Sequence, residues 1–121
     1  EHKLKFNVLK KTVLRCKKTG LKTMIFAKDL KEALRIKRLK PDFIIIEPPE
    51  LVGGKISVSS AKPELIRNIS KKLKMKFLVG AGIHSKEDIE TAMKLGASGV
   101  AISSAVANAR NPERILKKLI G

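Results

Sequence analysis

The most informative segment of the chain is Phe43-Ile44-Ile45-Ile46-Glu47-Pro48-Pro49-Glu50-Leu51-Val52-Gly53-Gly54. It begins with an uninterrupted apolar run rich in β-branched side chains, which is typical of a strand buried on both faces of a parallel sheet. Glu47 follows this run directly and so lies at the carboxyl end of the strand. Because parallel α/β folds place their chemistry at that edge, the stretch predicts both a parallel sheet and a candidate acid–base residue.

Two interpretations of Glu47 are open at this point. A carboxylate after a strand can cap a neighbouring helix or face solvent without any chemical role. It can also serve as a base beside a moving loop. Pro48 and Pro49 stiffen the chain that leaves the strand, and Gly53 and Gly54 then allow it to bend, as in a lid that closes as a rigid unit. The second interpretation predicts proton-transfer catalysis.

Helices and strands are predicted to alternate along the whole chain. Apolar spacing, capping residues, and glycine or proline at segment ends indicate five helices with four short strands between them. This helix-first order with short joints requires parallel strands and right-handed crossovers. The helices are expected at about 7–19, 29–38, 63–73, 86–95 and 112–120, and the strands at 23–26, 43–47, 77–79 and 100–102.

Length and composition indicate one small domain over residues 1–121, since 43% of the residues are hydrophobic. No apolar run approaches the roughly 20 residues of a membrane-crossing helix. The single Cys16 allows no internal disulfide, which fits a reducing compartment. We therefore expect a cytoplasmic protein with no membrane partner. Because the chain begins with Glu rather than Met, we also expect a fragment or a processed product.

The formal net charge of +16 predicts attraction to phosphates, nucleic acid and anionic surfaces. Lysines occur on every expected helix, as in Lys10-Lys11, Lys71-Lys72 and Lys117-Lys118. The chain has no Trp or Tyr on which bases could stack, and it has no signature of a nucleic-acid-binding fold. We therefore interpret the charge as solvated helix faces and expect nucleic acid to bind only without specificity.

The stretch from Ile46 to Gly54, with Val58-Ser59-Ser60-Ala61-Lys62-Pro63-Glu64 behind it, closely resembles the base-and-lid segment of archaeal triosephosphate isomerases. Leu78-Val79-Gly80-Ala81-Gly82-Ile83 resembles that family's next phosphate loop, and Gly99-Val100-Ala101-Ile102-Ser103-Ser104 resembles its last strand and loop. Order and spacing agree along the chain. The resemblance implies the C-terminal half of a TIM barrel, helix first, with about four of the eight strand–helix units.

The resemblance also implies an activity, the interconversion of dihydroxyacetone phosphate and glyceraldehyde 3-phosphate, with no cofactor and no metal. Glu47 would be the catalytic base, and Glu1 would be an auxiliary acid near the reacting oxygens. Lid and loops would hold the triose phosphate, largely through backbone N–H groups, because convergent amides on turns bind phosphate well. The substrate-binding residues expected on this basis are Val52, Gly53, Gly82, Ser103 and Ser104.

The resemblance leaves out the front half of the barrel, which carries an essential lysine and histidine of the family; neither His2 nor His84 stands at that histidine's position. A half barrel has two open sheet edges and an uncovered inner face, so it should be unstable alone or should associate. Three outcomes are open: pairing with a separate front half, pairing with itself, or closing into an open flavodoxin-like sheet. We expect the isolated chain to be inactive. The alternative function is a non-catalytic basic half-barrel module that binds phosphate or nucleic acid.

Overall fold

The computed structural model describes residues 2–121, and Glu1 lies outside the described residues. The chain is helix-first and its strands are parallel, as expected, but strict alternation of helices and strands ends after the second strand. The elements are α1 (Phe6–Lys18), β1 (Met24–Ala27), α2 (Leu30–Lys37), β2 (Phe43–Ile46), the 3₁₀ turn η1 (Pro49–Leu51), α3 (Val58–Ala61), α4 (Pro63–Leu73), β3 (Phe77–Val79), α5 (Lys86–Lys94), α6 (Ser104–Ala107) and α7 (Pro112–Ile120).

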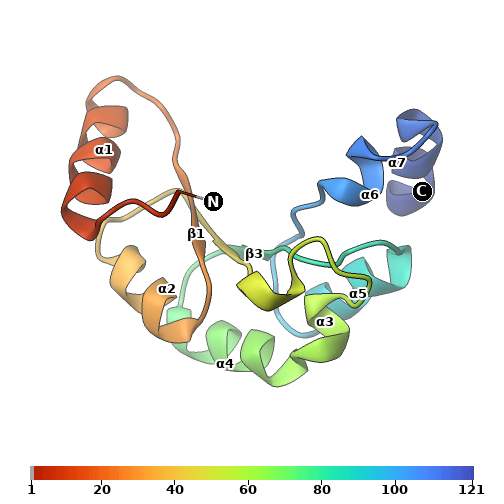
Figure 1. Ribbon diagram of the computed structural model, residues 1–121. Coiled ribbons are helices and arrows are strands. Elements are labelled where there is room, and N and C mark those ends of the chain that lie inside the picture. Colours follow the sequence, from red (N-terminus) through yellow and green to blue (C-terminus); the bar gives the residue numbers. More distant parts are fainter. Residues whose placement is uncertain (1) are drawn as a thin grey trace.

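The three strands form one parallel sheet in the order β1-β2-β3 (Figure 1). In this register Ile45 of β2 pairs with Phe26 of β1 on one side and with Leu78 of β3 on the other. These three residues therefore lie in one row across the sheet and point to the same face. The strand order equals the chain order, so each helix crosses from one strand to its immediate neighbour, as in a parallel barrel wall.

The fourth strand expected at 100–102 is reduced to a single bridge between Val79 and Val100. The amide of Ala101 donates to the carbonyl of Val79 at 2.8 Å, and the amide of Val79 donates to the carbonyl of Gly99 at 3.2 Å. The segment thus lies beside β3 but does not continue as a strand. Within residues 2–121 this segment has a neighbouring strand on one side only. Few backbone hydrogen bonds pair it with β3, so this end of the sheet is less regular than the rest.

The helix count also differs from the expected five, because α3 and α6 are two additional helices of four residues each. Both are single turns within segments that the sequence analysis assigned to loops. Ser57 caps the start of α3, because its hydroxyl accepts a hydrogen bond from the amide of Ser60 at 3.2 Å. Burial of Val58 then holds this turn against the body of the protein. One capped and buried turn is too short to produce a helical period in the sequence.

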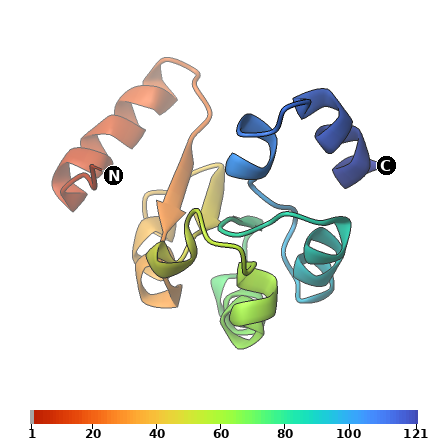
Figure 2. The ribbon, with the colours of Figure 1, turned by 45° about the vertical axis from the view of Figure 1, so that its right-hand side comes forward.

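The core lies between the sheet and the helices that cover one of its faces. Figure 2 shows these helices in an arc around the strands, with α1 at one end and α6 and α7 at the other. The sheet contributes Ile44, Ile46 and Val79, all fully buried. From α4, Ile66 and Ile69 pack on them and are also fully buried. Each such side chain stabilises the fold by about 1.5–3 kcal/mol through burial alone, so α2 and α4 are held firmly on the sheet.

The opposite face of the sheet is not covered in the same way. Met24 and Phe26 alternate with the buried Ile25 and Ala27 along β1, and their side chains are 52% and 55% exposed. Apolar side chains on that face therefore meet solvent, as an isolated barrel wall would require. None of the described helices is long and apolar enough to cross a membrane.

Candidate active site

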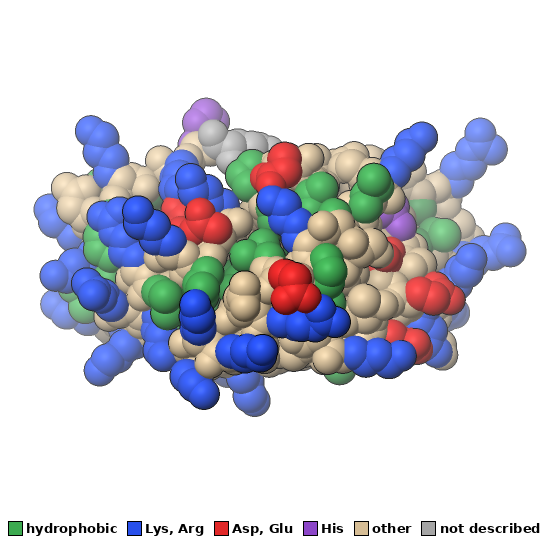
Figure 3. All heavy atoms as spheres, turned by 90° about the horizontal axis from the view of Figure 1, so that it is seen from below, with side chains coloured by type: hydrophobic (Ala, Val, Ile, Leu, Met, Phe, Trp, Pro, Cys, Tyr) green, Lys and Arg blue, Asp and Glu red, His purple; other side chains and the backbone are tan. Residues whose placement is uncertain are grey.

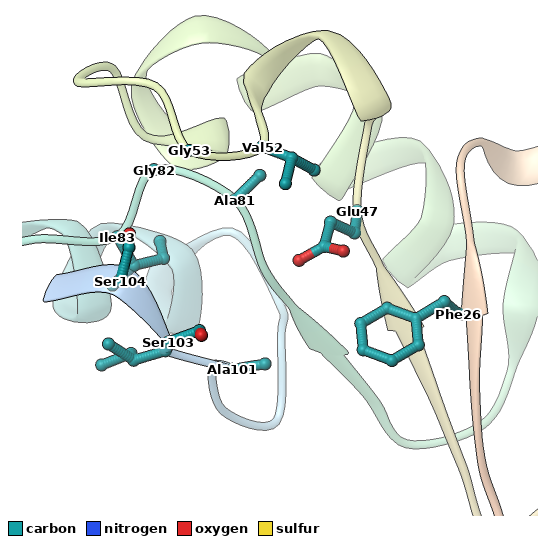
Figure 4. Close-up of a pocket in the computed structure, with 11 residues that line it drawn as sticks. Phe26, Glu47, Val52, Gly53, Ala81, Gly82, Ile83, Ala101, Ser103 and Ser104 are labelled. Atoms are coloured by element: carbon teal, nitrogen blue, oxygen red, sulfur yellow. The ribbon is translucent and has the colours of Figure 1, made fainter. Parts of the chain in front are cut away.

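A pocket of about 310 Å³ opens at the carboxyl ends of the strands (Figure 4). All five residues expected to bind substrate line it, and so does the expected base, Glu47. Glu1, the expected auxiliary acid, lies outside the described residues, so the structure places only six of the seven. The pocket is lined by Phe26, Glu47, Val52, Gly53, Ala81, Gly82, Ile83, Ala101, Ile102, Ser103 and Ser104.

Glu47 is held at the end of β2 by the sheet itself, since its amide donates to the carbonyl of Ala27 at 2.9 Å. Its carboxylate points into the pocket (Figure 4). Gly80 leaves room for it, because a methyl group on the Gly80 α-carbon would lie 2.7 Å from Oε1 of Glu47. Partial burial raises the pKa of the Glu47 carboxyl above its ordinary value. A carboxylate that has lost part of its hydration is a stronger base than one in water.

The segment after Glu47 combines a stiff turn with a free joint. Pro48 is fully buried, and η1 follows it with Pro49 at its first position. Within this turn the amide of Val52 donates to the carbonyl of Pro49 at 3.3 Å. Gly53 then takes a φ of +70°, and apart from its two chain neighbours none of the described residues has an atom within 4 Å of the place where a β-carbon would be. Bending is therefore concentrated at a glycine behind a rigid turn, as a lid requires.

The far end of this segment is fixed to the loop that follows β3. The amide of Val58 donates to the carbonyl of Ala81 at 3.1 Å. The buried hydroxyls of Ser57 and Ser59 lie 3.0 Å apart, and Ser59 Oγ donates to the backbone carbonyl of Asp88 at 3.1 Å. A buried and satisfied polar network is rigid, so the mobile part of the segment ends before Ser57.

The loop after β3 takes an unusual backbone course. Ala81 has a φ of +77° and Gly82 a φ of +67°, so two consecutive residues lie in the left-handed region. Nδ1 of His84 lies 2.6 Å from the carbonyl oxygen of Gly82. The Asp88 carboxylate accepts hydrogen bonds from the amides of His84 and Ser85, at 3.1 and 3.0 Å. These contacts fix the shape of a loop whose residues Ala81, Gly82 and Ile83 line the pocket.

Asp88 also closes a capping box at the start of α5, in which the amide of Asp88 donates to the hydroxyl of Ser85. Partial burial raises the pKa of this carboxyl, but hydrogen bonds from Ser57, His84 and Ser85 outweigh that effect and lower the pKa overall. Asp88 is therefore ionised at neutral pH and has a structural role. It joins the end of the lid segment to the loop after β3.

Many backbone amides around the pocket have no partner. Within residues 2–121, seven lining residues have an amide that donates no hydrogen bond to another group of the chain: Gly53, Ala81, Gly82, Ile83, Ile102, Ser103 and Ser104. Four of these seven are residues expected to bind substrate, whereas the amide of Val52 is used in η1 and only its side chain lines the pocket. Free amide donors around a cavity can bind an anion such as a phosphate. No three His, Cys, Asp or Glu side chains of the described chain come together as a possible metal site.

Phe26, Ala81, Ile83, Ala101 and Ile102 also line the pocket, and the sequence analysis did not expect them as site residues. Phe26 and Ile102 are the last residues of two expected strands, and Phe26 pairs with Ile45, two residues before Glu47. A rule that takes the last residue of every strand as a lining position would have found these two. Ala101 lies inside the expected strand, and Ala81 and Ile83 lie in the loop after strand 77–79, so that rule would have missed them.

The fold defines a class of protein, the α/β barrels. In solved structures, the chain is similar to a tryptophan synthase α-subunit mutant from Pyrococcus furiosus, with a TM-score of 0.79 and 19% identity over 98% of this chain and 52% of that one. It is also similar to the N-acetylmannosamine-6-phosphate 2-epimerase of Clostridium perfringens, with a TM-score of 0.70 and 20% identity over 93% of this chain and 48% of that one. These likenesses establish part of a TIM-barrel fold.

Sequence comparison identifies the family. The family model of triosephosphate isomerase matches residues 10–119. The triosephosphate isomerase of Saccharolobus solfataricus is 40% identical over 99% of this chain and 55% of its own length, and that of Archaeoglobus fulgidus is 36% identical over all of this chain and 56% of its own length. The chain therefore belongs to the triosephosphate isomerase family. It spans slightly more than half the length of these relatives.

Proposed function

We propose that this chain supplies the base, the lid and the phosphate loops of an archaeal-type triosephosphate isomerase. In this proposal residues 1–121 form a single domain, the C-terminal half of an eight-stranded barrel, and act only with the complementary half. The observation that carries the proposal is one pocket that is lined both by a partly buried carboxylate, Glu47, and by residues whose amides have no partner within the described chain, Gly53, Gly82, Ser103 and Ser104 among them. A base and amide donors in one pocket fit a small phosphorylated substrate.

Glu47 is the base of the proposed reaction. Its carboxylate removes a proton from the carbon beside the carbonyl of dihydroxyacetone phosphate, which gives an enediolate. The hydroxyl proton moves to the former carbonyl oxygen, and the Glu47 carboxyl returns its proton to the neighbouring carbon to give glyceraldehyde 3-phosphate. The partial burial that raises its pKa makes the carboxylate a better proton acceptor. Closure of the segment from Pro48 to Lys55 over the substrate excludes water and strengthens this effect.

The phosphate of the substrate lies at the amides of Gly53, Gly82, Ser103 and Ser104. Three separate segments contribute these residues to the pocket, and the proposal has their amides bind a single anion together. Val52 adds an apolar contact from the lid. An anion held at this point fixes the distance between the substrate carbon and the Glu47 carboxylate, and such positioning accounts for a large share of catalysis in general.

The proposed site is incomplete in this chain. The resemblance to the family assigns carbonyl polarisation to a histidine of the front half of the barrel, and that half also carries an essential lysine. Glu1 is proposed as the auxiliary acid of the assembled site. We therefore propose that the isolated chain is inactive and that a complementary front half restores turnover in the cytoplasm.

A second candidate is a non-catalytic basic module that binds phosphate or nucleic acid. The net charge of +16 favours it, because such a chain attracts polyanions whatever its fold. This candidate uses the same pocket but requires no chemistry from Glu47. The two candidates differ in one respect that can be measured, which is turnover after assembly.

Reconstitution tests the proposed function. The chain is mixed with the part of the Saccharolobus solfataricus triosephosphate isomerase that it does not match, and isomerisation is followed in both directions. We expect turnover from the mixture, none from either part alone, and none when the chain carries Glu47→Gln. A mixture that assembles and binds inorganic phosphate but never isomerises would favour the basic module.

A further inference from the structure

The positive charge of the chain is concentrated at its two ends. Residues 2–22 contain eight Lys or Arg and no Asp or Glu. Residues 108–121 contain four Lys or Arg and a single Glu. The long middle part, residues 23–107, contains fifteen basic and nine acidic residues, so it is far closer to balance. A general preference for lysine would have spread the excess evenly, and it does not explain this distribution.

These two ends flank the open edges of the sheet. The helix α1 precedes β1, which pairs with β2 only, and α7 follows the segment that joins β3 through one bridge. Figure 2 places α1 and α7 at opposite ends of the helical arc. In Figure 3 the left-hand end, where Figure 1 has α1, is crowded with Lys and Arg and shows no acidic side chain at its tip. We call α1 and α7 the edge helices.

Apolar residues on or after the edge helices are exposed. Leu21, between α1 and β1, is 62% exposed, and Met24 and Phe26 of β1 are exposed as well. Ile120, the last residue of α7, is 74% exposed. A groove lies between α7 and the turn before it. It is lined by Ala109, Arg110, Asn111, Arg114, Ile115 and Lys118, with three cations and no acid. Apolar surface rimmed by charge is typical of a protein interface.

We propose that the two edges form one docking surface for a net-acidic polypeptide that reaches both of them. The inference rests on the proposed function, in which a complementary half covers the open sheet, and it specifies the chemistry of that partner. Acidic side chains of the partner meet the edge helices, while its apolar residues cover Met24 and Phe26. Charge complementarity at a rim selects the partner and speeds its approach, and the apolar centre holds it.

Two other occupants fit the surface less well. A second copy of this chain would bring edge helices against edge helices, and like charges at an interface disfavour that arrangement. Single-stranded nucleic acid would be attracted by the positive charge. However, β1 and the edge helices have no Trp or Tyr on which bases could stack, and the exposed aliphatic side chains would remain exposed to solvent.

The probe for the experiment is the part of the Saccharolobus solfataricus triosephosphate isomerase that this chain does not match, made in two versions. One version has exposed lysines replaced by Glu, and the other has exposed glutamates replaced by Lys. We expect the acidic version to bind this chain at least about tenfold more tightly in about 0.01 M salt, and the ratio to shrink towards one in about 1 M salt.

Two variants of this chain locate the effect. Each reverses four exposed charges, so the change in net charge is the same. The edge variant carries Lys10→Glu, Lys11→Glu, Arg114→Glu and Lys118→Glu, and the control carries Lys31→Glu, Lys71→Glu, Lys72→Glu and Lys94→Glu on α2, α4 and α5. We expect the edge variant to lose the preference for the acidic probe and the control to keep most of it.

Several results would overturn the inference. Equal losses in the two variants would mean that total charge acts without an edge surface, and failure of both probe versions to bind would remove the polypeptide partner. A stable dimer of the unmodified chain in sedimentation at low salt would assign the surface to a second copy. Tighter binding of oligo(dT) than of the acidic probe, lost in the edge variant, would assign it to nucleic acid. The readout is binding, so an assembled complex without isomerase activity would contradict only the proposed function.

Discussion

The α-carbon of Gly80 faces the carboxylate of Glu47 so closely that a methyl group on it would lie 2.7 Å from Oε1. The amide of Gly80 also donates to the carbonyl of Ile46 at 2.9 Å, so the glycine cannot move away without breaking the sheet. Only the carboxylate can yield. The loop that follows β3 therefore determines where the proposed base can stand.

Gly80→Ala should consequently displace the carboxylate rather than the backbone. In the reconstituted complex we expect turnover to fall by about 100-fold, the cost of a misplacement of about 1 Å, with a much smaller change in KM. The matched control is Gly99→Ala, where the added methyl group would lie 3.1 Å from the flexible tip of Leu78. Steady-state kinetics on both variants separate the two effects. Equal losses would show that Gly80 acts through general stability.

Gly82→Ala should destabilise the chain much more than Gly53→Ala, although both glycines have a φ near +70°. The backbone conformation costs either alanine about 1–2 kcal/mol. At Gly82 the new methyl group would also overlap the backbone carbonyl of Ile56, whereas at Gly53 it would meet open space. We expect the free energy of unfolding in urea to fall by about 3 kcal/mol or more for Gly82→Ala. Similar losses for both would contradict this packing.

Glu47→Gln should stabilise the isolated chain at neutral pH. The folded state raises the pKa of this carboxyl, so the folded state binds its proton more tightly than the unfolded state does. The unmodified chain therefore loses stability as the pH rises from the unfolded pKa through the folded one. The variant lacks this loss, so its advantage in urea unfolding should appear in that interval and vanish in acid. If the free energies of unfolding of the variant and the unmodified chain differ by the same amount at every pH, Glu47 is fully hydrated in the folded state.

Asp42 should show the opposite dependence. Its carboxylate accepts a hydrogen bond from the amide of Thr23 at 2.6 Å, and this bond lowers the pKa of the carboxyl. Its stabilising contribution is present above the unfolded pKa and is lost as the pH falls through the folded one. Asp42→Asn should lower stability at neutral pH and leave it nearly unchanged in acid. Urea unfolding at two pH values checks the sign, and a loss of equal size at both would contradict it.

Glu47→Asp should separate chemistry from binding in the reconstituted complex. Shortening the side chain by one methylene group withdraws the carboxylate by about 1 Å, so turnover should drop by about 100-fold or more. The phosphate amides belong to other residues, so inhibition by inorganic phosphate should be nearly unchanged. Unchanged turnover would show that another group is the base.

The long elements of the fold were predictable, and the single turns were not. The helix at 63–73 and the strand at 77–79 agree with the structure, because Pro63 marks the helix start and the strand is a clear apolar run. The turns α3 and α6 depend on one cap or on a few contacts across the chain, which no periodicity reveals. The strand expected at 100–102 failed because a short segment needs neighbours, and its sequence does not say whether they are present.

The pocket was predictable as far as it follows from strand ends. Glu47, Gly82 and Ser103 each come just after an apolar run, and parallel strands bring such positions to one edge. The clearance at Gly80 and the attachment of the lid at Ser57 were beyond the sequence, since both depend on distances between segments that are far apart in the chain. The excess of basic residues near both termini was visible in the sequence. Only the structure showed that these two segments lie at the open edges of the sheet.

The single bridge between Val79 and Val100 separates two parts of the pocket that differ in how many backbone hydrogen bonds hold them in place. Glu47 and Gly82 stand on the well-paired three-stranded sheet, whereas Ser103 and Ser104 belong to the segment beyond that bridge. Local unfolding starts where few bonds must break, so amides after Val100 should exchange with solvent long before those of β2. The chain can thus lose half of its anion site while its core stays intact, and an anion that engages both halves would slow that exchange.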